Sequence, residues 1–184
     1  MTIPNSSHKK QLRNSIRSLL RTAPATSAAT CEAVREWLAA RPALHTVALF
    51  AALPGEVDLL PLLAWDPARR WVFPRVISHD LAFHQVQDPY RDLIIGLPLG
   101  IREPSPSLPL VPLTAVDVFL CPGLAFDHHR GRLGRGRGFY DRTLAAARPD
   151  ALKIGVCHPH QLVLNVFQEP HDVSMDEVIA GPSR

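Results

Sequence analysis

The sequence predicts a single α/β domain with a largely parallel β-sheet. The chain has 184 residues, which is the size of one ordinary domain. Short apolar runs alternate along it with segments whose apolar residues recur at helical spacing. The short runs are hydrophobic throughout, as in parallel strands covered on both faces. We therefore expect residues 1–184 to form one domain in which helices flank a sheet.

The first two elements are predicted to be helices. Ser6 or Ser7 is placed to cap the first. Its apolar stripe, spaced i, i+4, i+7 and i+8, is Leu12, Ile16, Leu19 and Leu20. The second helix is expected from about Ser27 to Arg41, before Pro42. Its inward-facing residues are expected to be Cys31, Val34 and Leu38.

Strands are predicted from Thr46 onward. TVALFAA (46–52) favours a buried strand that ends at the turn residues Pro54 and Gly55, with a helix from about Asp58. The further strands expected are WVFPRV (71–76), LAFHQV (81–86), VDVFLCPG (116–123) and IGVCH (154–158). The segment PLGIREPSPSLPLVPL (98–113) holds five prolines and is expected to be an extended surface loop.

Composition excludes several classes of protein. The formal net charge of +3 is too small to indicate a nucleic-acid or anionic-membrane partner by itself. Cys31, Cys121 and Cys157 are odd in number and form no CxxC pair, which favours a reducing compartment. No apolar run approaches the length of a membrane span, and the first residues lack the apolar core of a secretory signal. We expect a cytoplasmic protein with no membrane partner.

The stretch GRLGRGRGFYDRTL (131–144) is the most informative part of the sequence. Its four glycines need a compensating reason, because glycine loses the most backbone freedom on folding. Successive backbone N–H groups before a helix can form a cradle for an anion. Five arginines crowd the same region: Arg130, Arg132, Arg135, Arg137 and Arg142. Phosphate binding is the first interpretation, with a flexible arginine-glycine loop and RNA contact as alternatives, since neither familiar nucleotide motif is present.

The longer line VFLCPGLAFDHHRGRLGRGRGFYDRTL (118–144) resembles the signature of the 5-formyltetrahydrofolate cyclo-ligase family. Four further stretches are similar to the family in the same order along the chain. They are KKQLR (9–13), GEVD (55–58), GIREP (100–104) and HDVSMDEVI (171–179). The resemblance therefore covers nearly the whole chain.

The resemblance implies an ATP-dependent enzyme that converts 5-formyltetrahydrofolate into 5,10-methenyltetrahydrofolate with release of ADP and phosphate, using Mg²⁺. It implies a three-layer α/β/α, Rossmann-like fold of the NagB/RpiA/CoA transferase type. The partners it implies are small molecules, with no nucleic acid and no membrane, and the chain is expected to be a monomer or weak homodimer. Two alternatives stay open: a paralogue with the same ATP site and another small substrate, and a non-catalytic RNA-binding module.

The resemblance also implies site residues. ATP contacts fall on Lys9, Lys10, Gln11, Leu12, Arg13, Arg132, Leu133, Gly134, Arg135, Gly136, Arg137, Gly138, Phe139 and Tyr140. Folate contacts fall on Ala51, Glu56, Arg135, Gly136, Arg137, Gly138 and Phe139. Arg132 and Arg137 are the catalytic residues implied, although Arg137 stands where other members carry lysine or glycine. Asp141 and Asp172 match the metal positions, with Asp127 as a weaker third.

Taken alone, the same residues have simpler interpretations. Lys9 and Arg13 would be a solvated helical face, and Lys10 an ordinary surface charge. Glu56 would be an acid at a helix start. The two metal-matching aspartates would be caps or turn residues, and the aromatic pair after Gly138 would belong to the core. No role is assigned to the adjacent histidines 128 and 129.

Overall fold

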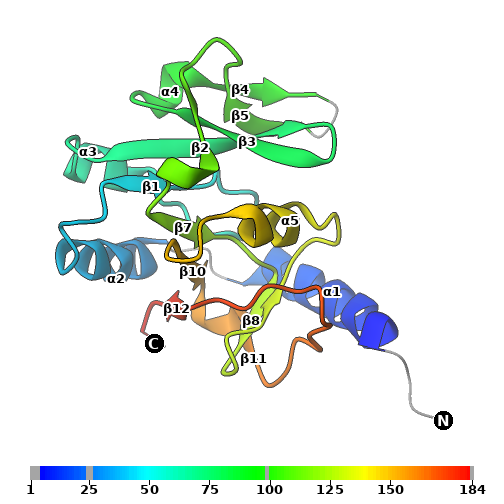
Figure 1. The fold of residues 1–184 in the computed structure, drawn as a ribbon. Helices are drawn as coiled ribbons and strands as arrows, with labels where there is room; N and C mark the ends of the chain where they lie inside the picture. The colour runs from blue at the N-terminus through cyan, green and yellow to red at the C-terminus, as the bar shows by residue number, and fades with distance from the viewer. Residues whose placement is uncertain (1–4, 24–26, 98–99, 183–184) are drawn as a thin grey trace.

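The structure is a computed structural model that describes residues 5–23, 27–97 and 100–182. A seven-stranded sheet in the order β12-β10-β7-β1-β2-β3-β6 runs through it. The strands are β1 (Thr46–Ala48), β2 (Arg70–Ile77), β3 (Asp80–Gln85), β6 (Leu110–Val111), β7 (Val118–Cys121), β10 (Leu152–Cys157) and β12 (Glu177–Ala180). Neighbours from β12 to β2 are parallel, whereas β3 and β6 are antiparallel additions at one edge. The predicted mainly parallel α/β sheet is confirmed (Figure 1).

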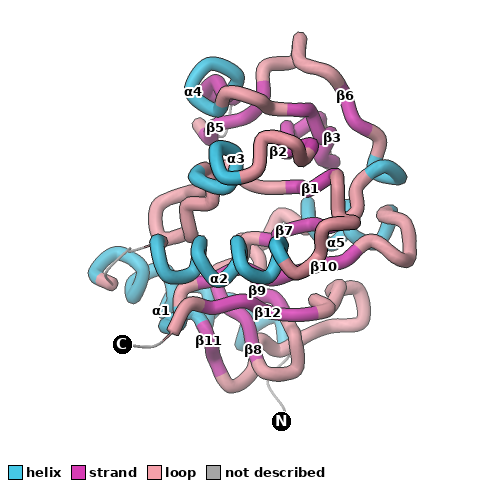
Figure 2. Tube along the Cα trace, turned by 90° about the vertical axis from the view of Figure 1, so that its left-hand side faces the viewer, coloured by secondary structure: helices cyan, strands magenta, loops and turns pink. Residues whose placement is uncertain are grey.

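Side chains on both faces of the parallel strands are buried, which explains their continuous apolar sequences. On one face, Val47 and Leu120 pack with helix α2 (Ala28–Ala39) and the short helix α3 (Pro61–Trp65). On the other, Phe119 and Cys121 pack with helix α5 (Phe139–Ala146). Two cores therefore separate three layers. Figure 1 shows α2 and α5 on opposite sides of the sheet, and Figure 2 looks from the side of α2.

Helix α1 (Asn5–Thr22) packs outside these layers, against a small three-stranded sheet. That sheet consists of β8 (Ala125–Asp127), β9 (Arg132–Leu133) and β11 (Leu162–Val163). Ile16 of α1 is buried against Leu124 and Leu133 in a third hydrophobic cluster. The small sheet thus fixes the start of the arginine-glycine segment beside α1.

Strands β4 (Leu93–Gly96) and β5 (Ile101–Pro104) and helix α4 (Pro89–Asp92) lie at the upper edge of Figure 1. The two strands form an antiparallel pair. Helix α4 precedes them, and the 3₁₀ turns are η1 (Leu113–Ala115) and η2 (Pro159–Gln161). None of the helices in the described ranges is both long enough and apolar enough to cross a membrane.

Three predictions about elements are wrong. The proline-rich segment is not only loop, because β5 and β6 lie within it; Pro98 lies outside the described residues. Ser6 and Ser7 are inside α1 and do not cap it. Leu19 is exposed, since the third cluster takes only part of the expected apolar stripe. The buried face of α2 is as predicted.

Candidate active site

A cavity of about 780 Å³ lies at the carboxyl ends of β1 and β7. Phe50 and Ala51 follow β1 into its wall, and Pro122 and Gly123 follow β7. From β1 the chain builds β2 on one side and later returns to β7 on the other, so the strand order reverses here. Ligands of open α/β sheets collect in the crevice at such a reversal.

The arginine-glycine segment crosses this cavity between β9 and α5. Gly136 has φ of +100° and Gly138 of +68°, a left-handed conformation that side chains other than glycine rarely adopt. Gly138 is the residue from which α5 begins. Residues 134–138 form a loop, whereas Arg132 and Leu133 before it belong to strand β9, and Phe139 and Tyr140 after it belong to α5.

Arg132 is buried at the floor of the cavity. Its Nη2 lies 2.8 Å from Oδ1 of Asp141, and its Nη1 donates to the carbonyl of Pro122 at 3.4 Å. The guanidinium carbon lies 5.3 Å from the centre of the Tyr140 ring. Arg137 differs, because it is exposed, and within the described residues its guanidinium has no hydrogen-bond or ion-pair partner.

Glu56 and Arg135 form an ion pair across the cavity. Nε and Nη2 of Arg135 lie 3.0 and 2.9 Å from Oε1 of Glu56. Oε2 of Glu56 accepts the N–H of Leu53 at 3.0 Å. Burial raises the pKa of Glu56, and Arg135 together with the Leu53 N–H opposes that rise. The carboxylate is thus held by two hydrogen bonds and the guanidinium charge of the protein itself.

Helix α1 contributes three cations to the same cavity. Lys9 is buried and pairs with Glu169, 2.7 Å from Oε2, and with Asp172. Nε of Arg13 donates to the carbonyl of Gly134 at 3.0 Å. Arg17 donates to the carbonyl of Arg135 at 3.3 Å and lines the cavity.

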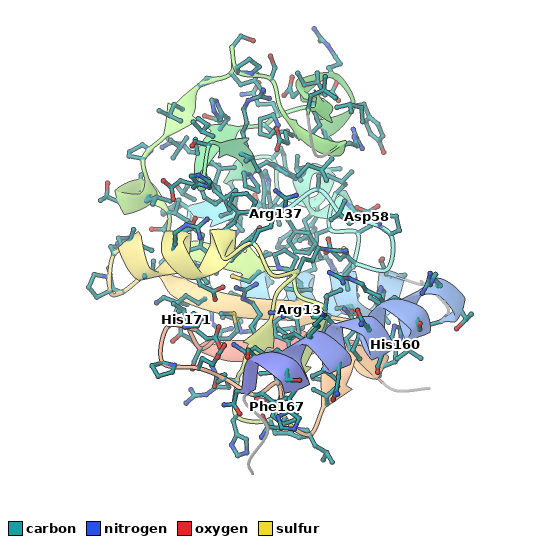
Figure 3. All side chains as sticks on the ribbon, turned by 90° about the vertical axis from the view of Figure 1, so that its right-hand side faces the viewer. Arg13, Asp58, Arg137, His160, Phe167 and His171 are labelled. Carbon is teal, nitrogen blue, oxygen red and sulfur yellow. The ribbon has the colours of Figure 1, made fainter. Side chains whose placement is uncertain are left out.

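The other three residues of KKQLR lie outside the cavity lining. Lys10 and Gln11 are exposed on α1, and Leu12 packs against the third hydrophobic cluster. Figure 3 looks onto this face, with Arg13 and Arg137 near its middle and His171 to one side. The helical spacing of Lys9 and Arg13 brings both to the cavity, as their separation of four residues predicts.

A cluster of possible cation ligands lies at the end of the cavity near Lys9. One ligand atom each from Glu169, His171 and Asp172 lies within 4.8 Å of the others. Asp141, the other predicted metal residue, lines the cavity in its ion pair with Arg132. The weaker candidate is wrong: Asp127 is buried, and its carboxylate accepts the backbone N–H groups of residues 129, 131 and 166.

Tyr140 has a buried hydroxyl with no hydrogen-bond partner among the described residues. Burial raises its pKa well above the ordinary value, so the hydroxyl remains a donor. The ring packs against the second core, which agrees with the simpler interpretation of this aromatic pair. Phe139 lies below Arg142, whose guanidinium carbon is 5.6 Å from the ring centre.

Sequence reasoning missed several lining residues. Arg17, Glu169 and His171 carry charge or metal-binding atoms, and only their nearness to matched motif residues could have signalled them. The apolar wall comes from four separate strands and turns, so no local pattern marks it. Its residues are Phe50, Leu53, Pro74, Val76, Leu81 and Ile101.

The structure is that of an α/β protein with a cavity rich in arginine at the switch point of its sheet. The model of the 5-formyltetrahydrofolate cyclo-ligase family matches residues 5–181. The chain belongs to this family, and the predicted resemblance is confirmed.

Individual relatives agree with this assignment. A 5-formyltetrahydrofolate cyclo-ligase of Mycolicibacterium smegmatis is 36% identical over 181 residues, covering 93% of this chain and 92% of the relative. One of Escherichia coli is 33% identical over 148 residues, covering 76% and 79%. The solved structure of Aquifex aeolicus 5,10-methenyltetrahydrofolate synthetase is 29% identical, with a TM-score of 0.78 over 94% of this chain and 89% of that one. The fold is also similar to that of the Mycoplasma pneumoniae synthetase, at 23% identity, with a TM-score of 0.77 over 93% and 97%.

Proposed function

We propose that this protein catalyses the ATP-dependent cyclisation of 5-formyltetrahydrofolate to 5,10-methenyltetrahydrofolate, releasing ADP and phosphate. Cyclo-ligase activity in folate one-carbon metabolism follows from membership of the family. The observation that carries the proposal is one cavity in which a cationic glycine loop faces a buried carboxylate. The loop suits a triphosphate, and the carboxylate suits a heterocycle that donates N–H groups.

The cationic side of the cavity is the ATP subsite in this proposal. Lys9 and Arg13 reach it from α1, and the segment from Arg132 to Tyr140 passes through it. Arg17 is added because its side chain lines the same wall. Lys10, Gln11 and Leu12 remain part of the matched motif, but their positions on α1 favour a supporting role.

The folate subsite lies around Glu56 and Ala51, with the segment from Arg135 to Phe139 on its other side. A pterin has adjacent N–H donors, and a carboxylate accepts such a pair through its two oxygens. The unpartnered hydroxyl of Tyr140 can donate a hydrogen bond from the floor of the same cavity. The apolar wall described above provides a surface for the flat ring system.

The reaction proposed proceeds in two stages. The formyl oxygen attacks the γ-phosphorus, and ADP leaves. N10 then attacks the activated carbon and loses its proton, and phosphate leaves with the former formyl oxygen. Negative charge spreads over the γ-phosphoryl oxygens in the first stage, and cations positioned beforehand stabilise it. Arg137 is free to contact these oxygens, whereas Arg132 is held in place by Asp141 and orients the loop from below.

The donor set fits Mg²⁺, which prefers hard oxygen ligands and retains several waters. Asp172 and Asp141 would hold the ion, with Glu169 near Asp172. Both aspartates face the cavity but are paired with Lys9 and Arg132, so these pairs have to loosen when a cation binds. When bound, the ion would neutralise phosphate charge during phosphoryl transfer.

The direct test is an absorbance assay. We expect purified protein with 5-formyltetrahydrofolate, ATP and Mg²⁺ to produce the near-ultraviolet absorbance of the methenyl product, and omission of ATP to abolish it. Absence of product at saturating substrate would contradict the proposal. ATP binding without product would instead favour a paralogue that uses another small substrate.

Assembly as a monomer or weak homodimer and a cytoplasmic location stay predictions.

A further inference from the structure

The ion pair between Glu56 and Arg135 joins the folate subsite to the loop that the proposed function places between the two ligands. Glu56 belongs to the folate subsite, and Arg135 lies in the loop that faces the triphosphate. Oε1 of Glu56 already accepts the Nε–H of Arg135 and lies 2.9 Å from Nη2 of the same guanidinium, and Oε2 accepts the N–H of Leu53. A heterocycle that needs both oxygens therefore competes with Arg135.

Glu56 cannot simply be left without a partner. Its side chain is 6% exposed, and a buried carboxylate without a compensating donor is costly. Burial already raises its pKa despite the nearby guanidinium. The departure of Arg135 is therefore favourable only when other N–H groups replace it and when the guanidinium finds a new anion.

The geometry around Arg135 allows such an exchange. Its side chain is 37% exposed, while its backbone is held by the hydrogen bonds that Arg17 and Arg13 donate to the carbonyls of residues 135 and 134. The side chain can thus turn without movement of the loop. A guanidinium also binds phosphate oxygens through paired N–H donors as readily as it binds a carboxylate.

We propose that Arg135 is a positioning residue that couples the two substrate subsites. In the free protein Arg135 pairs with Glu56. When a triphosphate binds, the guanidinium of Arg135 pairs with phosphate oxygens instead, so Glu56 becomes free to accept the N–H groups of the pterin. Nucleotide binding therefore strengthens folate binding. By thermodynamic linkage, folate strengthens nucleotide binding by the same factor. This inference rests on the proposed function.

The test measures 5-formyltetrahydrofolate binding by calorimetry, with and without a non-hydrolysable ATP analogue and Mg²⁺. In the unmodified protein the analogue should lower the folate Kd at least about fivefold. In Arg135→Gln, folate should bind without the analogue about as tightly as the unmodified protein binds with it, and the analogue should change Kd less than about twofold. The titration is run at pH 8, because loss of Arg135 removes a charge that lowers the pKa of Glu56.

Arg137→Gln is the matched control. It removes the same charge from the same loop, but Arg137 makes no ion pair with Glu56. We expect it to weaken binding of the analogue while folate and saturating analogue still strengthen each other as in the unmodified protein. Melting temperatures of both variants confirm that they are folded.

Two outcomes would overturn the coupling role. One is an Arg135→Gln variant that retains the full effect of the analogue on folate affinity. The other is a variant that binds folate more weakly in both conditions, which would make Arg135 a direct folate ligand. An unmodified protein that binds folate equally with and without the analogue would also refute the coupling but leave the proposed function standing. No folate binding in either condition would refute the proposed function itself.

Discussion

Carboxylates and arginines meet at both ends of the parallel strands, but the groups that surround them differ. At the amino ends, Oδ2 of Asp117 accepts the backbone N–H groups of His45 and Thr46 at 2.8 Å each, and Oδ1 pairs with Arg148. At the carboxyl ends, Glu56 and Arg135 pair with each other beside an open cavity. The first arrangement ties β1 to β7, whereas the second faces the space where a ligand can enter.

Arg69 shows the same contrast for a cation. It is buried near the amino ends, where Nε lies 2.9 Å from Oδ2 of Asp66 and the remaining donors reach backbone carbonyls. Those carbonyls belong to Leu38, Arg41 and Leu44. A side-chain partner can turn away when a ligand binds, whereas a backbone carbonyl is fixed by the fold. Ion pairs at the carboxyl ends are therefore suited to exchange, and those at the amino ends to stability.

The largest effect is expected from Arg137→Ala. This arginine is exposed and has no partner to lose within the described part of the chain, so stability should change by less than about 0.5 kcal/mol. Loss of one cation aimed at the transferring phosphoryl group should lower kcat about 100- to 1000-fold. Steady-state kinetics measures kcat, and chemical denaturation measures the free energy of unfolding. Arg132→Ala is the contrasting variant, because it leaves Asp141 unpaired and should lower both kcat and the free energy of unfolding. An unchanged kcat in Arg137→Ala would show that Arg137 takes no part in catalysis.

An intermediate effect is expected from Asp117→Asn. The amide keeps an oxygen for the backbone donors but loses its charge-assisted bond to Arg148, which should cost about 1–2 kcal/mol of unfolding free energy. Activity should be preserved, because the change lies at the other end of the strands. Asp150→Asn is the control: Asp150 is 72% exposed, lies 2.8 Å from the same arginine and should matter by less than about 0.5 kcal/mol. Equal losses in the two variants would show that burial does not distinguish these carboxylates.

The smallest effect, and one of opposite sign, is expected from Glu56→Gln. Folding raises the pKa of this carboxyl above its ordinary value of 4.5, so the folded protein holds the proton more tightly than the unfolded chain does. The protein stability that this proton contributes is complete below pH 4.5 and is lost as the pH rises through the folded-state pKa. A neutral amide avoids that loss. The variant should melt about 1–3 °C higher at pH 8 and should match the unmodified protein near pH 4. Thermal denaturation across this pH range checks the sign, and lower stability at pH 8 would mean that the pair with Arg135 outweighs the cost of burial.

The parallel core of the fold was predictable because its strands carry continuous apolar runs, as in VDVFLC and IGVC. Strands β8, β9 and β11 were not, since two or three residues cannot show a period. Strand β5 was hidden by prolines, yet it pairs with β4 from Ile101 to Pro104, and buried Glu103 accepts the N–H of Val76. Tertiary pairing there prevails over local composition.

The site was predictable where chemistry is concentrated in a motif. The residues from Gly134 to Asp141 reach the cavity as expected, and so do Lys9, Arg13, Glu56 and Asp172. Which of these residues pair with one another in the free protein could not be predicted, because each pair joins positions far apart in the chain. Lys9 with Asp172 is the widest example.

The three cysteines of the chain are buried, and burial raises the pKa of Cys121 and Cys157 to about 12 and that of Cys31 above its usual value. Thiol reagents attack the thiolate, which these side chains scarcely form while the chain is folded. Their labelling rate in increasing denaturant would thus report the opening of the molecule without any engineered probe. Because Cys121 ends β7 directly before the cavity wall at Pro122, slower labelling of this thiol on addition of substrates would measure how far ligands protect the centre of the sheet.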